Sequence, residues 1–332
     1  LGSVCRACGY DEIITYSFIS PTYYDKILWP ADYHARKSFK ILNPLGEDTS
    51  IMRTTTLPSM LEILTRNYNF RNKSAKLYEV GRIYLPKSGS TPVSPDAPAL
   101  AASKEKLENM GVNGLTEALT GALNQMDQDD GLANEAKVLS MGAYGEDMDF
   151  FTLKGEIEAI LHQIGTRAPA YEALTDNHSY HPGRCAAVLI DGVTVGCFGQ
   201  IHPLVADNYG LSGEIYAAEL DFTALGQLLA PDPVYTPLPK YPTTSRDLAL
   251  VCDDSIPVGT LENCIQAAGG KLLRKVNLFD IYRGAPIAEG KKSVAFSLEL
   301  RADDRTLTDE EADKVIQKVL KTLETECQAV LR

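Results

Sequence analysis

Few side chains in this sequence of 332 residues have the types and spacing that chemistry needs, and one group of four is the most informative. Asp280, Tyr282, Arg283 and Ser293 lie at the ends of two adjacent predicted strands. A tyrosine ring offers a stacking platform to a base, and a carboxylate or hydroxyl can hydrogen-bond a base edge. The group therefore indicates recognition of single-stranded RNA, although periodicity alone equally allows Tyr282 to pack against its neighbours.

Two other groups raise the question of metal or acid–base chemistry. Cys5 and Cys8 form the only close cysteine pair, and a structural zinc site needs two further ligands at matching spacing. His178 and His181 lie together in DNHSYHPGR, where hydrogen bonding or packing is the favoured interpretation over a metal or acid–base role. The sequence contains no Walker loop, Gly-x-Gly-x-x-Gly, His-Glu-x-x-His or Gly-x-Ser-x-Gly motif. We therefore expect no catalytic residue and no metal site in this chain.

The composition of the chain indicates a globular protein. The chain is 44% hydrophobic and 23% charged, without an apolar run long enough for a membrane-spanning helix, so we expect globular domains and no membrane partner. Seven scattered cysteines and no export signal favour a reducing, cytoplasmic location. The chain begins at Leu1 rather than Met and runs directly into structured-looking sequence, so we expect a fragment of a longer protein.

The formal net charge of -12 argues against a strongly basic nucleic-acid binder, but the excess negative charge lies almost entirely before Lys240. The C-terminal part carries a modest basic stretch. On charge alone this stretch is an ordinary solvated surface, since phosphate binding needs clustered cations. The candidates for contact with an RNA backbone are Arg246, Arg274, Lys275, Arg283, Lys291 and Lys292.

The first part of the chain predicts a mixed sheet with helices. We expect strands over residues 13–20, 37–46 and 75–86, because each is an apolar run that ends in turn residues. Apolar spacing predicts helices over residues 57–72 and 148–165, and Asp191-Gly192 predicts a hairpin turn between two strands. A strand and a short helix are expected over residues 214–229. The Pro-, Ser- and Ala-rich stretch of about 88–135 is interpreted as an insertion.

The last part of the chain predicts a separate small domain. Residues 230–242 contain five prolines and are interpreted as an extended linker between a module over 1–229 and a domain over 243–332. The domain has the order strand, helix, strand, strand, helix, strand, which is typical of a ferredoxin-like βαββαβ unit. Its last helix begins with a predicted capping box formed by Thr308 and Glu311.

Several of these segments resemble one known family. YPTTSRDLALV and FDIYRGAPIAEGKKSVAFSLELRADDRTLTDEEAD resemble the C-terminal anticodon-binding domain of the bacterial phenylalanyl-tRNA synthetase beta subunit. ITYSFISP, NPLGEDTSIMRTTTLPSMLEILTRNYNF, LYEVGRIY, DFFTLKGEIEAIL and SYHPGRCAAVLIDGVTVGCFGQIHP resemble the catalytic-like module of that subunit. The resemblance implies an α+β fold, with a class II synthetase-like antiparallel sheet module followed by a ferredoxin-like anticodon-binding domain.

The resemblance also implies roles for particular residues. In the family, the Phe-Asp-x-Tyr element and the later Lys-Ser contact the first anticodon base, which carries over to Asp280, Tyr282 and Ser293 in tRNA(Phe) recognition. Catalysis would belong to a separate alpha subunit in an (αβ)2 heterotetramer, where the holoenzyme uses ATP and magnesium, and this chain would hold no cofactor. Arg53 and Arg82 match the surroundings of motif 2, but no Gly-x-Gly-x-Gly-x-x-Arg follows, so a structural or interfacial role is expected.

Further consequences of the resemblance concern what this chain lacks. The family's beta subunit has N-terminal parts that bind tRNA, edit mischarged tRNA and bind magnesium, and none of them is expected here. Two alternatives stay open from the residues alone. One is a free-standing ferredoxin-like protein that binds or is regulated by a metabolite, because a fold does not determine a function. The other is an independent enzyme built around His178, His181 and Arg184.

Overall fold

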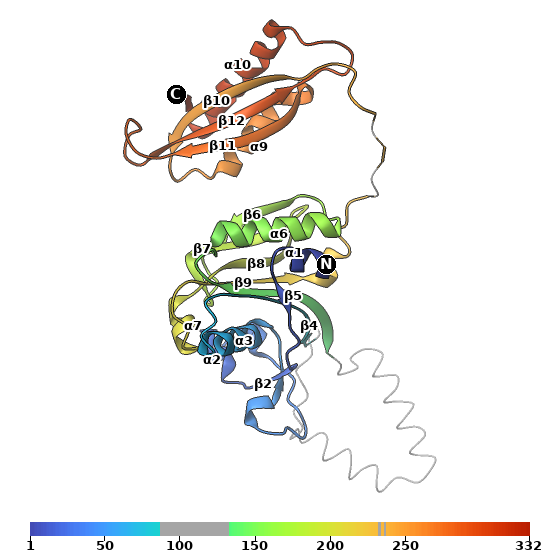
Figure 1. Cartoon of the computed structure of the whole chain (residues 1–332), viewed down its shortest axis with the longest axis vertical. Helices are drawn as coiled ribbons and strands as arrows, with labels where there is room; N and C mark the ends of the chain where they lie inside the picture. The colour runs from blue at the N-terminus through green and yellow to red at the C-terminus, as the bar shows by residue number, and fades with distance from the viewer. Residues whose placement is uncertain (87–132, 232–233, 236) are drawn as a thin grey trace. The chain divides into compact units, whose positions relative to one another are not determined.

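The chain folds as two units, which are described here one at a time. The computed structural model describes residues 1–86, 133–231, 234–235 and 237–332 (Figure 1). Unit 1 is Leu1–Asp232 and unit 2 is Pro233–Arg332, so the division falls inside the proline-rich stretch of residues 230–242. The expected insertion of about 88–135 lies outside the described residues, except for its last three, of which Asn134 and Glu135 begin a strand.

Unit 1 is built on a seven-stranded sheet in the order β1-β4-β5-β9-β8-β7-β6. Neighbouring strands are antiparallel except for β1 and β4, which are parallel, so the expectation of a largely antiparallel sheet is confirmed. The strands are β1 (Asp11–Glu12), β4 (Ala75–Leu85), β5 (Asn134–Tyr144), β6 (Pro169–Ala173), β7 (Tyr180–Ile190), β8 (Val193–Ile201) and β9 (Ile215–Asp221).

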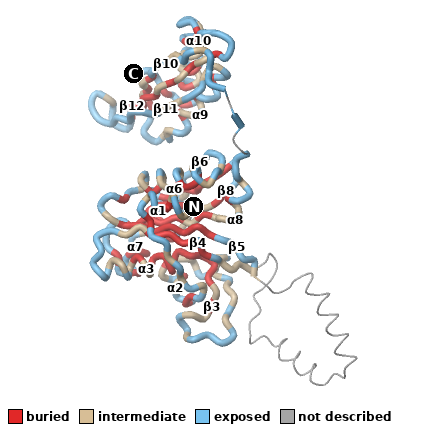
Figure 2. The backbone as a smooth tube through the Cα atoms, turned by 45° about the vertical axis from the view of Figure 1, so that its right-hand side comes forward, coloured by how far each residue is buried: buried red, intermediate tan, exposed pale blue. Residues whose placement is uncertain are grey.

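Helices cover both faces of this sheet. Along β9, Ala218 and Leu220 pack into one core and Ile215 and Ala217 into the other, because successive strand side chains point to opposite faces. Figure 2 shows the buried strands between the two layers. The first core is closed by α1 (Gly2–Ala7), α6 (Phe150–Ile164) and α8 (Phe222–Leu225), and the second by α2 (Tyr23–Lys26), α3 (Leu57–Asn69) and α7 (Pro203–Asn208).

The predicted helices and the hairpin of unit 1 are confirmed. Helix α3 has its proline in the first turn, and α6 ends at Gly165, whose φ of 85° is the left-handed conformation of a helix C-cap. Asp191 and Gly192 both have positive φ between β7 and β8, which the expected tight turn requires.

Two predicted strands of unit 1 are wrong. Residues 37–46 form only an isolated bridge from Lys40 to Ile51, because the chain turns away through Pro44 and Gly46 into η2 (Glu47–Thr49). Residues 13–20 contribute only Phe18 and Ile19, which form β2 and pair with β3 (Ile51–Met52). The segment before them bonds to β4 and to a buried carboxylate instead of forming a ladder. A further short helix, η1 (His34–Arg36), directly precedes residues 37–46.

Unit 2 has the predicted βαββαβ order. Its elements are β10 (Thr244–Asp253), α9 (Val258–Gly269), η3 (Gly270–Leu272), β11 (Leu273–Tyr282), β12 (Lys291–Leu300), α10 (Asp309–Cys327) and β13 (Val330–Leu331). The antiparallel sheet has the order β11-β12-β10-β13, and α9 and α10 pack on one face of it. The capping box of Thr308 and Glu311 is present. No helix in the described ranges of either unit is long and apolar enough to span a membrane.

A buried ion pair joins three segments of unit 1. Arg53 is 1% exposed, and its Nη2 lies 3.2 Å from Oε1 of Glu79 on β4. The remaining donors reach Oγ1 of Thr15 at 2.6 Å and the carbonyl of Arg82 at 2.8 Å. Thr15 also donates to both carboxylate oxygens of Glu79. The network therefore fixes the segment around Thr15 against β4 and satisfies both buried charges.

The space for the guanidinium depends on a glycine. A Cβ atom built on Gly81 would lie 2.3 Å from Nη2 of Arg53, which is closer than any real contact. The absence of a side chain at position 81 lets the arginine pass over β4. Arg53 therefore has a structural position in this chain, in agreement with the expectation from the sequence.

Replacing Arg53 tests the importance of this network. We expect Arg53→Met to lower the free energy of unfolding of unit 1 by about 3 to 5 kcal/mol, because it leaves the Glu79 carboxylate buried without a cation. Arg82→Met is the control, since Arg82 and Glu135 form an exposed pair that should contribute less than about 1 kcal/mol. Urea unfolding followed by the fluorescence of Trp29, the only tryptophan and a residue of unit 1, measures both variants. Equal losses in the two variants would contradict the prediction.

Candidate nucleic-acid interface

The sheet of unit 2 has one face that the two helices of that unit leave uncovered. On β12, Val294, Phe296 and Leu298 are buried in the core with α9 and α10. The alternate residues Ser293 and Ala295 point to the opposite face. We call this surface the open face. It comprises Val251 of β10, Ser293 and Ala295 of β12, and the residues of β11 that pair with them.

Two irregularities in β11 decide which of its side chains reach the open face. The register skips Arg274 and Phe279, so each is an extra residue relative to β12. After the second bulge, Asp280 pairs with Ala295 and Tyr282 with Ser293. Since paired residues share a face, Asp280 and Tyr282 lie on the open face. Strict alternation from Lys275 would have placed both on the helix side.

Tyr282 is held in a defined orientation. Its hydroxyl donates to the carbonyl of Ala285 at 2.6 Å, in the turn that follows β11. The guanidinium carbon of Arg332 lies 5.9 Å from the centroid of the ring, which is a cation–π distance. The side chain is 38% exposed, so part of the ring is available for stacking.

Ser293 and Asp280 complete the group. Ser293 is only 4% exposed and lies between Tyr282 and Val251 in the register of the sheet. Its hydroxyl makes no hydrogen bond with the residues that the structure describes, and the carboxylate of Asp280 makes no ion pair with them. The structure thus brings the three predicted residues to one end of the open face, with a donor, an acceptor and a ring.

The six cations predicted to contact an RNA backbone do not share one environment. Four are paired with carboxylates: Arg246 with Asp309 and Asp313, Arg274 with Asp303, and both Arg283 and Lys292 with Asp254. Lys275 and Lys291 are exposed and form no ion pair within the described part of the chain. These two lysines are therefore the cations most available to a phosphate.

Lys292 is a correction to the prediction from charge. It points to the helix side of the sheet and is 4% exposed. Its ammonium donates to the carbonyls of Asp254 and Ile256, at 2.9 and 2.6 Å, and so fixes the chain that leads into α9. An ammonium with these partners is not presented to RNA, so its geometry argues for a structural role.

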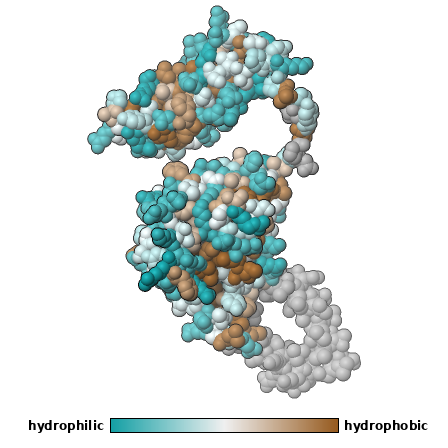
Figure 3. All heavy atoms as spheres, in the orientation of Figure 1, coloured by the Kyte–Doolittle hydropathy of each residue, from teal (hydrophilic) through white to brown (hydrophobic). Residues whose placement is uncertain are grey.

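Sequence reasoning missed two residues of this surface. Phe279 is 59% exposed at the bulge, next to the exposed Leu278 and Ile281, and Figure 3 shows the hydrophobic residues that gather in this region of unit 2. Arg332 reaches Tyr282 only because β13 pairs with β10. The sequence around Phe279 gave little signal of the first, because the apolar pair Leu278-Phe279 is flanked by Asn277 and Asp280. Long-range pairing leaves no local signal of the second.

The candidates of unit 1 do not assemble a catalytic or metal site. Nδ1 of His181 accepts the amide hydrogen of Gly183, and Arg184 pairs with Glu214 at 2.5 Å. Burial raises the pKa of the Cys5 thiol to about 11, so it is protonated at neutral pH. Among the residues with described positions, no group of three His, Cys, Asp or Glu side chains could hold a metal ion.

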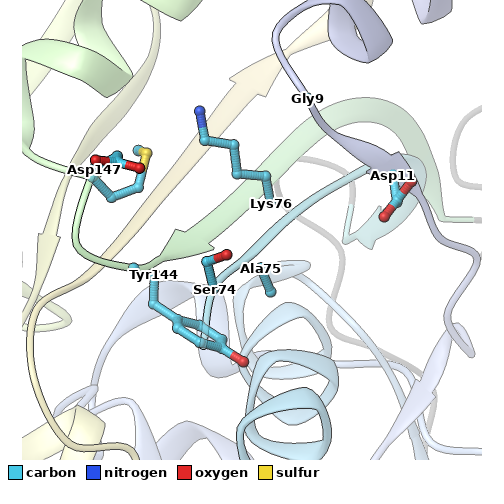
Figure 4. A pocket seen from close by; sticks show the side chains of 9 residues that line it. Gly9, Asp11, Ser74, Ala75, Lys76, Tyr144 and Asp147 are labelled. Atoms are coloured by element: carbon cyan, nitrogen blue, oxygen red, sulfur yellow. The ribbon is translucent and has the colours of Figure 1, made fainter. Parts of the chain in front are cut away.

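A polar pocket of unit 1 contains a lysine with a structural role. It has a volume of about 350 Å³ between the starts of β1 and β4 and the end of β5, and Lys76 projects into it (Figure 4). The ammonium of Lys76 is bonded to Glu156 of α6, and the hydroxyl of Tyr10 donates to the same carboxylate at 2.7 Å. The ammonium of Lys76 is therefore used to attach α6 to the sheet.

Family models match both units. The model described as "Phenylalanyl tRNA synthetase beta chain CLM domain" matches residues 1–222. The model described as "Ferredoxin-fold anticodon binding domain" matches residues 239–332. Together they cover nearly the whole chain.

Relatives of known name extend this result. Proteins named phenylalanine–tRNA ligase beta subunit are 38% identical in Clostridium acetobutylicum and 39% identical in Clostridium tetani, each over 324 residues. Both alignments cover 98% of this chain and 36% of the relative. The Bacillus subtilis protein of the same name is 37% identical over 290 residues, which is 87% of this chain and 32% of the relative. The chain thus spans about a third of the length of the relatives it matches.

The position of Lys292 leads to a prediction about stability. We expect Lys292→Met to lower the free energy of unfolding of unit 2 by about 1 to 3 kcal/mol, because the carbonyls of Asp254 and Ile256 lose their donor. The control is the exposed neighbour Lys291, because Lys291→Met should change the free energy of unfolding of unit 2 by no more than about 0.5 kcal/mol. Hydrogen exchange of β12 amides in increasing urea measures both variants. A stable Lys292→Met variant would show that the ammonium is dispensable to the fold.

Proposed function

Because this chain belongs to the phenylalanyl-tRNA synthetase beta-chain family, we propose that unit 2 recognises the anticodon of tRNA(Phe) during the attachment of phenylalanine to that tRNA. The observation that carries this proposal is the register of β11. The bulge at Phe279 places Asp280 and Tyr282 on the same open face as Ser293. A ring, a carboxylate and a hydroxyl at one end of a sheet are the groups that recognise a splayed base.

The three side chains have complementary tasks in this proposal. The ring of Tyr282 stacks on the first anticodon base, and the bond to Ala285 keeps the ring from turning away. Asp280 accepts hydrogen bonds from N–H groups on the base edge, and the hydroxyl of Ser293 donates to a base oxygen or nitrogen. Lys291, two residues before Ser293 on β12, and Lys275, toward the other end of β11, contact the backbone and contribute affinity without sequence preference.

Unit 1 supports the proposed assembly in a different way. We propose that it packs against a catalytic alpha subunit in a cytoplasmic (αβ)2 heterotetramer. Ile14 and Tyr16 are 93% and 81% exposed, an apolar surface that a partner protein would cover. Thr15, between them, points inward to the buried pair of Arg53 and Glu79, so the same network that stabilises unit 1 presents these two residues outward.

We propose that ATP and magnesium act in the alpha subunit. The arginine that resembles motif 2, Arg53, is committed to Glu79 and cannot hold a nucleotide phosphate. The alternative of a free-standing metabolite-binding or regulatory protein is not favoured, since relatives named phenylalanine–tRNA ligase beta subunit match 98% of this chain.

Substitution of Tyr282 tests the stacking role. We expect Tyr282→Ala to weaken the binding of tRNA(Phe) by about 1 to 3 kcal/mol, the contribution of one base–aromatic stack. Tyr282→Phe is the matched variant, which keeps the ring and should keep most of the affinity. Binding is measured by fluorescence anisotropy at one salt concentration, with a transcript whose first anticodon base is changed as the second ligand. Unchanged affinity in Tyr282→Ala, or equal affinity for the two transcripts, would rule out anticodon readout at this site.

The lysines are tested by salt dependence. We expect Lys291→Ala to weaken the binding of both transcripts equally and to reduce the slope of log K against log salt by about 1, because one phosphate contact is lost. Lys314→Ala is the control, since Lys314 is an exposed lysine of α10 on the helix side. A loss confined to the cognate transcript would instead indicate that Lys291 contacts a base.

A further inference from the structure

A cavity of about 430 Å³ lies in unit 1 on the face of the sheet that carries α2 and α3. Its volume is in the range of small-molecule sites. The floor comes from β5, β8 and β9, and one wall comes from the segment between α2 and η1. The residues that the argument uses are Trp29, Tyr33, Thr194, Glu219 and Asp221, all of which line the cavity.

One wall of the cavity is aromatic and preorganised. Trp29 stacks on Tyr24 with centroids 5.1 Å apart and an angle of 12° between the rings. Tyr33 contacts Trp29 in a tilted arrangement, with centroids 4.8 Å apart and an angle of 56° between the rings. Tyr24 is itself fixed, because its hydroxyl bonds to those of Ser38 and Thr54. The wall can therefore receive a flat apolar group, or a cation over a ring face, without reorganisation.

The charge of the cavity has one sign. Glu219 and Asp221 of β9 line it, and no lysine or arginine is among its lining residues in the described part of the chain. Thr55 and Thr56 donate to the carboxylate of Glu219 at 2.6 to 2.8 Å and hold it in place. Burial raises the pKa of Tyr33, and Cys197, Asp176 and Glu219 raise it further.

These features discriminate between classes of ligand. A nucleotide or a free carboxylic acid would bring negative charge to two carboxylates with no cation to compensate it, which disfavours both. A protonated amine gains from the same carboxylates and from the rings. An aromatic body matches the Trp29 wall, and the volume accommodates about ten non-hydrogen atoms or somewhat more.

We propose that this cavity binds a small aromatic amine in its protonated form, with the ring against Trp29 and the ammonium toward Asp221 and Glu219. The site is independent of the anticodon face, because every lining residue belongs to unit 1. Its ligand differs in charge from ATP and from the zwitterion phenylalanine, so the cavity is a separate binding site and not a second active site.

Three small molecules of nearly equal size test the proposal with the 332-residue chain. They are 2-phenylethylamine, phenylalanine and 3-phenylpropionate, which place a cation, a zwitterion and an anion on the same ring. Trp29 is the only tryptophan, so its fluorescence reports directly on the cavity wall. We expect saturable quenching by the amine, with weaker binding of phenylalanine and none of the acid. Isothermal titration calorimetry provides a second readout.

Two variants locate the binding. Asp221 caps α8 by accepting the amide hydrogen of Ala224, a task that asparagine performs equally well, so Asp221→Asn removes charge while keeping the cap. We expect it to weaken amine binding about three- to tenfold at low salt. Asp207→Asn is the control, an exposed aspartate of α7 that does not line the cavity. Thr194→Arg, at an exposed lining position, should abolish amine binding and admit 3-phenylpropionate.

The outcomes are decisive. Preference for the amine, weakened by Asp221→Asn but not by Asp207→Asn, supports the proposal. Absence of saturable binding by both methods would overturn it, and so would equal binding of amine and acid or equal effects of the two asparagine variants. Circular dichroism of each variant confirms that unit 1 is folded before binding is measured.

Discussion

A buried guanidinium needs acceptors for its N–H groups and a counter-charge, and in unit 1 these requirements join segments that are far apart in the sequence. Arg53 takes its partners from Thr15, from Glu79 and from the carbonyl of Arg82. Glu219 imposes a similar constraint at the start of α3, where Thr55 and Thr56 donate to it. The run Arg53-Thr-Thr-Thr56 thus connects β4, β9 and the first turn of α3. Removing the carboxylate of Glu79 or of Glu219 would leave buried donors without partners. The free-energy cost of such unpaired donors is far larger than the net stabilisation that the intact pairs provide.

The two sheets differ in how far helices cover their faces. In unit 1 both faces are covered by helices, and its described surface includes the exposed apolar residues Ile14 and Tyr16 and the cavity beside Trp29. In unit 2 the helices cover one face, and the other carries small side chains such as Ser293 and Ala295, 4% and 8% exposed, with the 38% exposed Tyr282 at its end. A half-covered sheet of this kind suits a flat ligand such as a base, whereas a fully covered sheet suits a scaffold.

Local signals in the sequence predicted the parts of the fold that local interactions determine. Helices α3, α6 and α10 have proline, glycine or capping-box signals at their ends, and the Asp191-Gly192 turn needs only the conformations of two residues. The prediction of a strand over residues 37–46 was wrong because an apolar run does not reveal whether a partner strand is available. The grouping of Asp280, Tyr282 and Ser293 came from their positions at the ends of adjacent predicted strands, and their contact with the first anticodon base came from the family resemblance. Neither the burial of Lys292 nor the stacking of Arg332 on Tyr282 has a local signal, because both depend on pairing between distant strands.

The bulge at Phe279 makes strand length as important as residue identity. If β11 kept Phe279 but paired without the bulge, the register after Leu278 would shift by one residue and turn the aspartate and the tyrosine toward the helices. A chain that lacked residue 279 would instead keep Asp280 opposite Ala295 and Tyr282 opposite Ser293 on a regular strand. A homologous chain could thus retain every letter of the motif and still lose its surface through a one-residue insertion or deletion in β11 that no bulge absorbs.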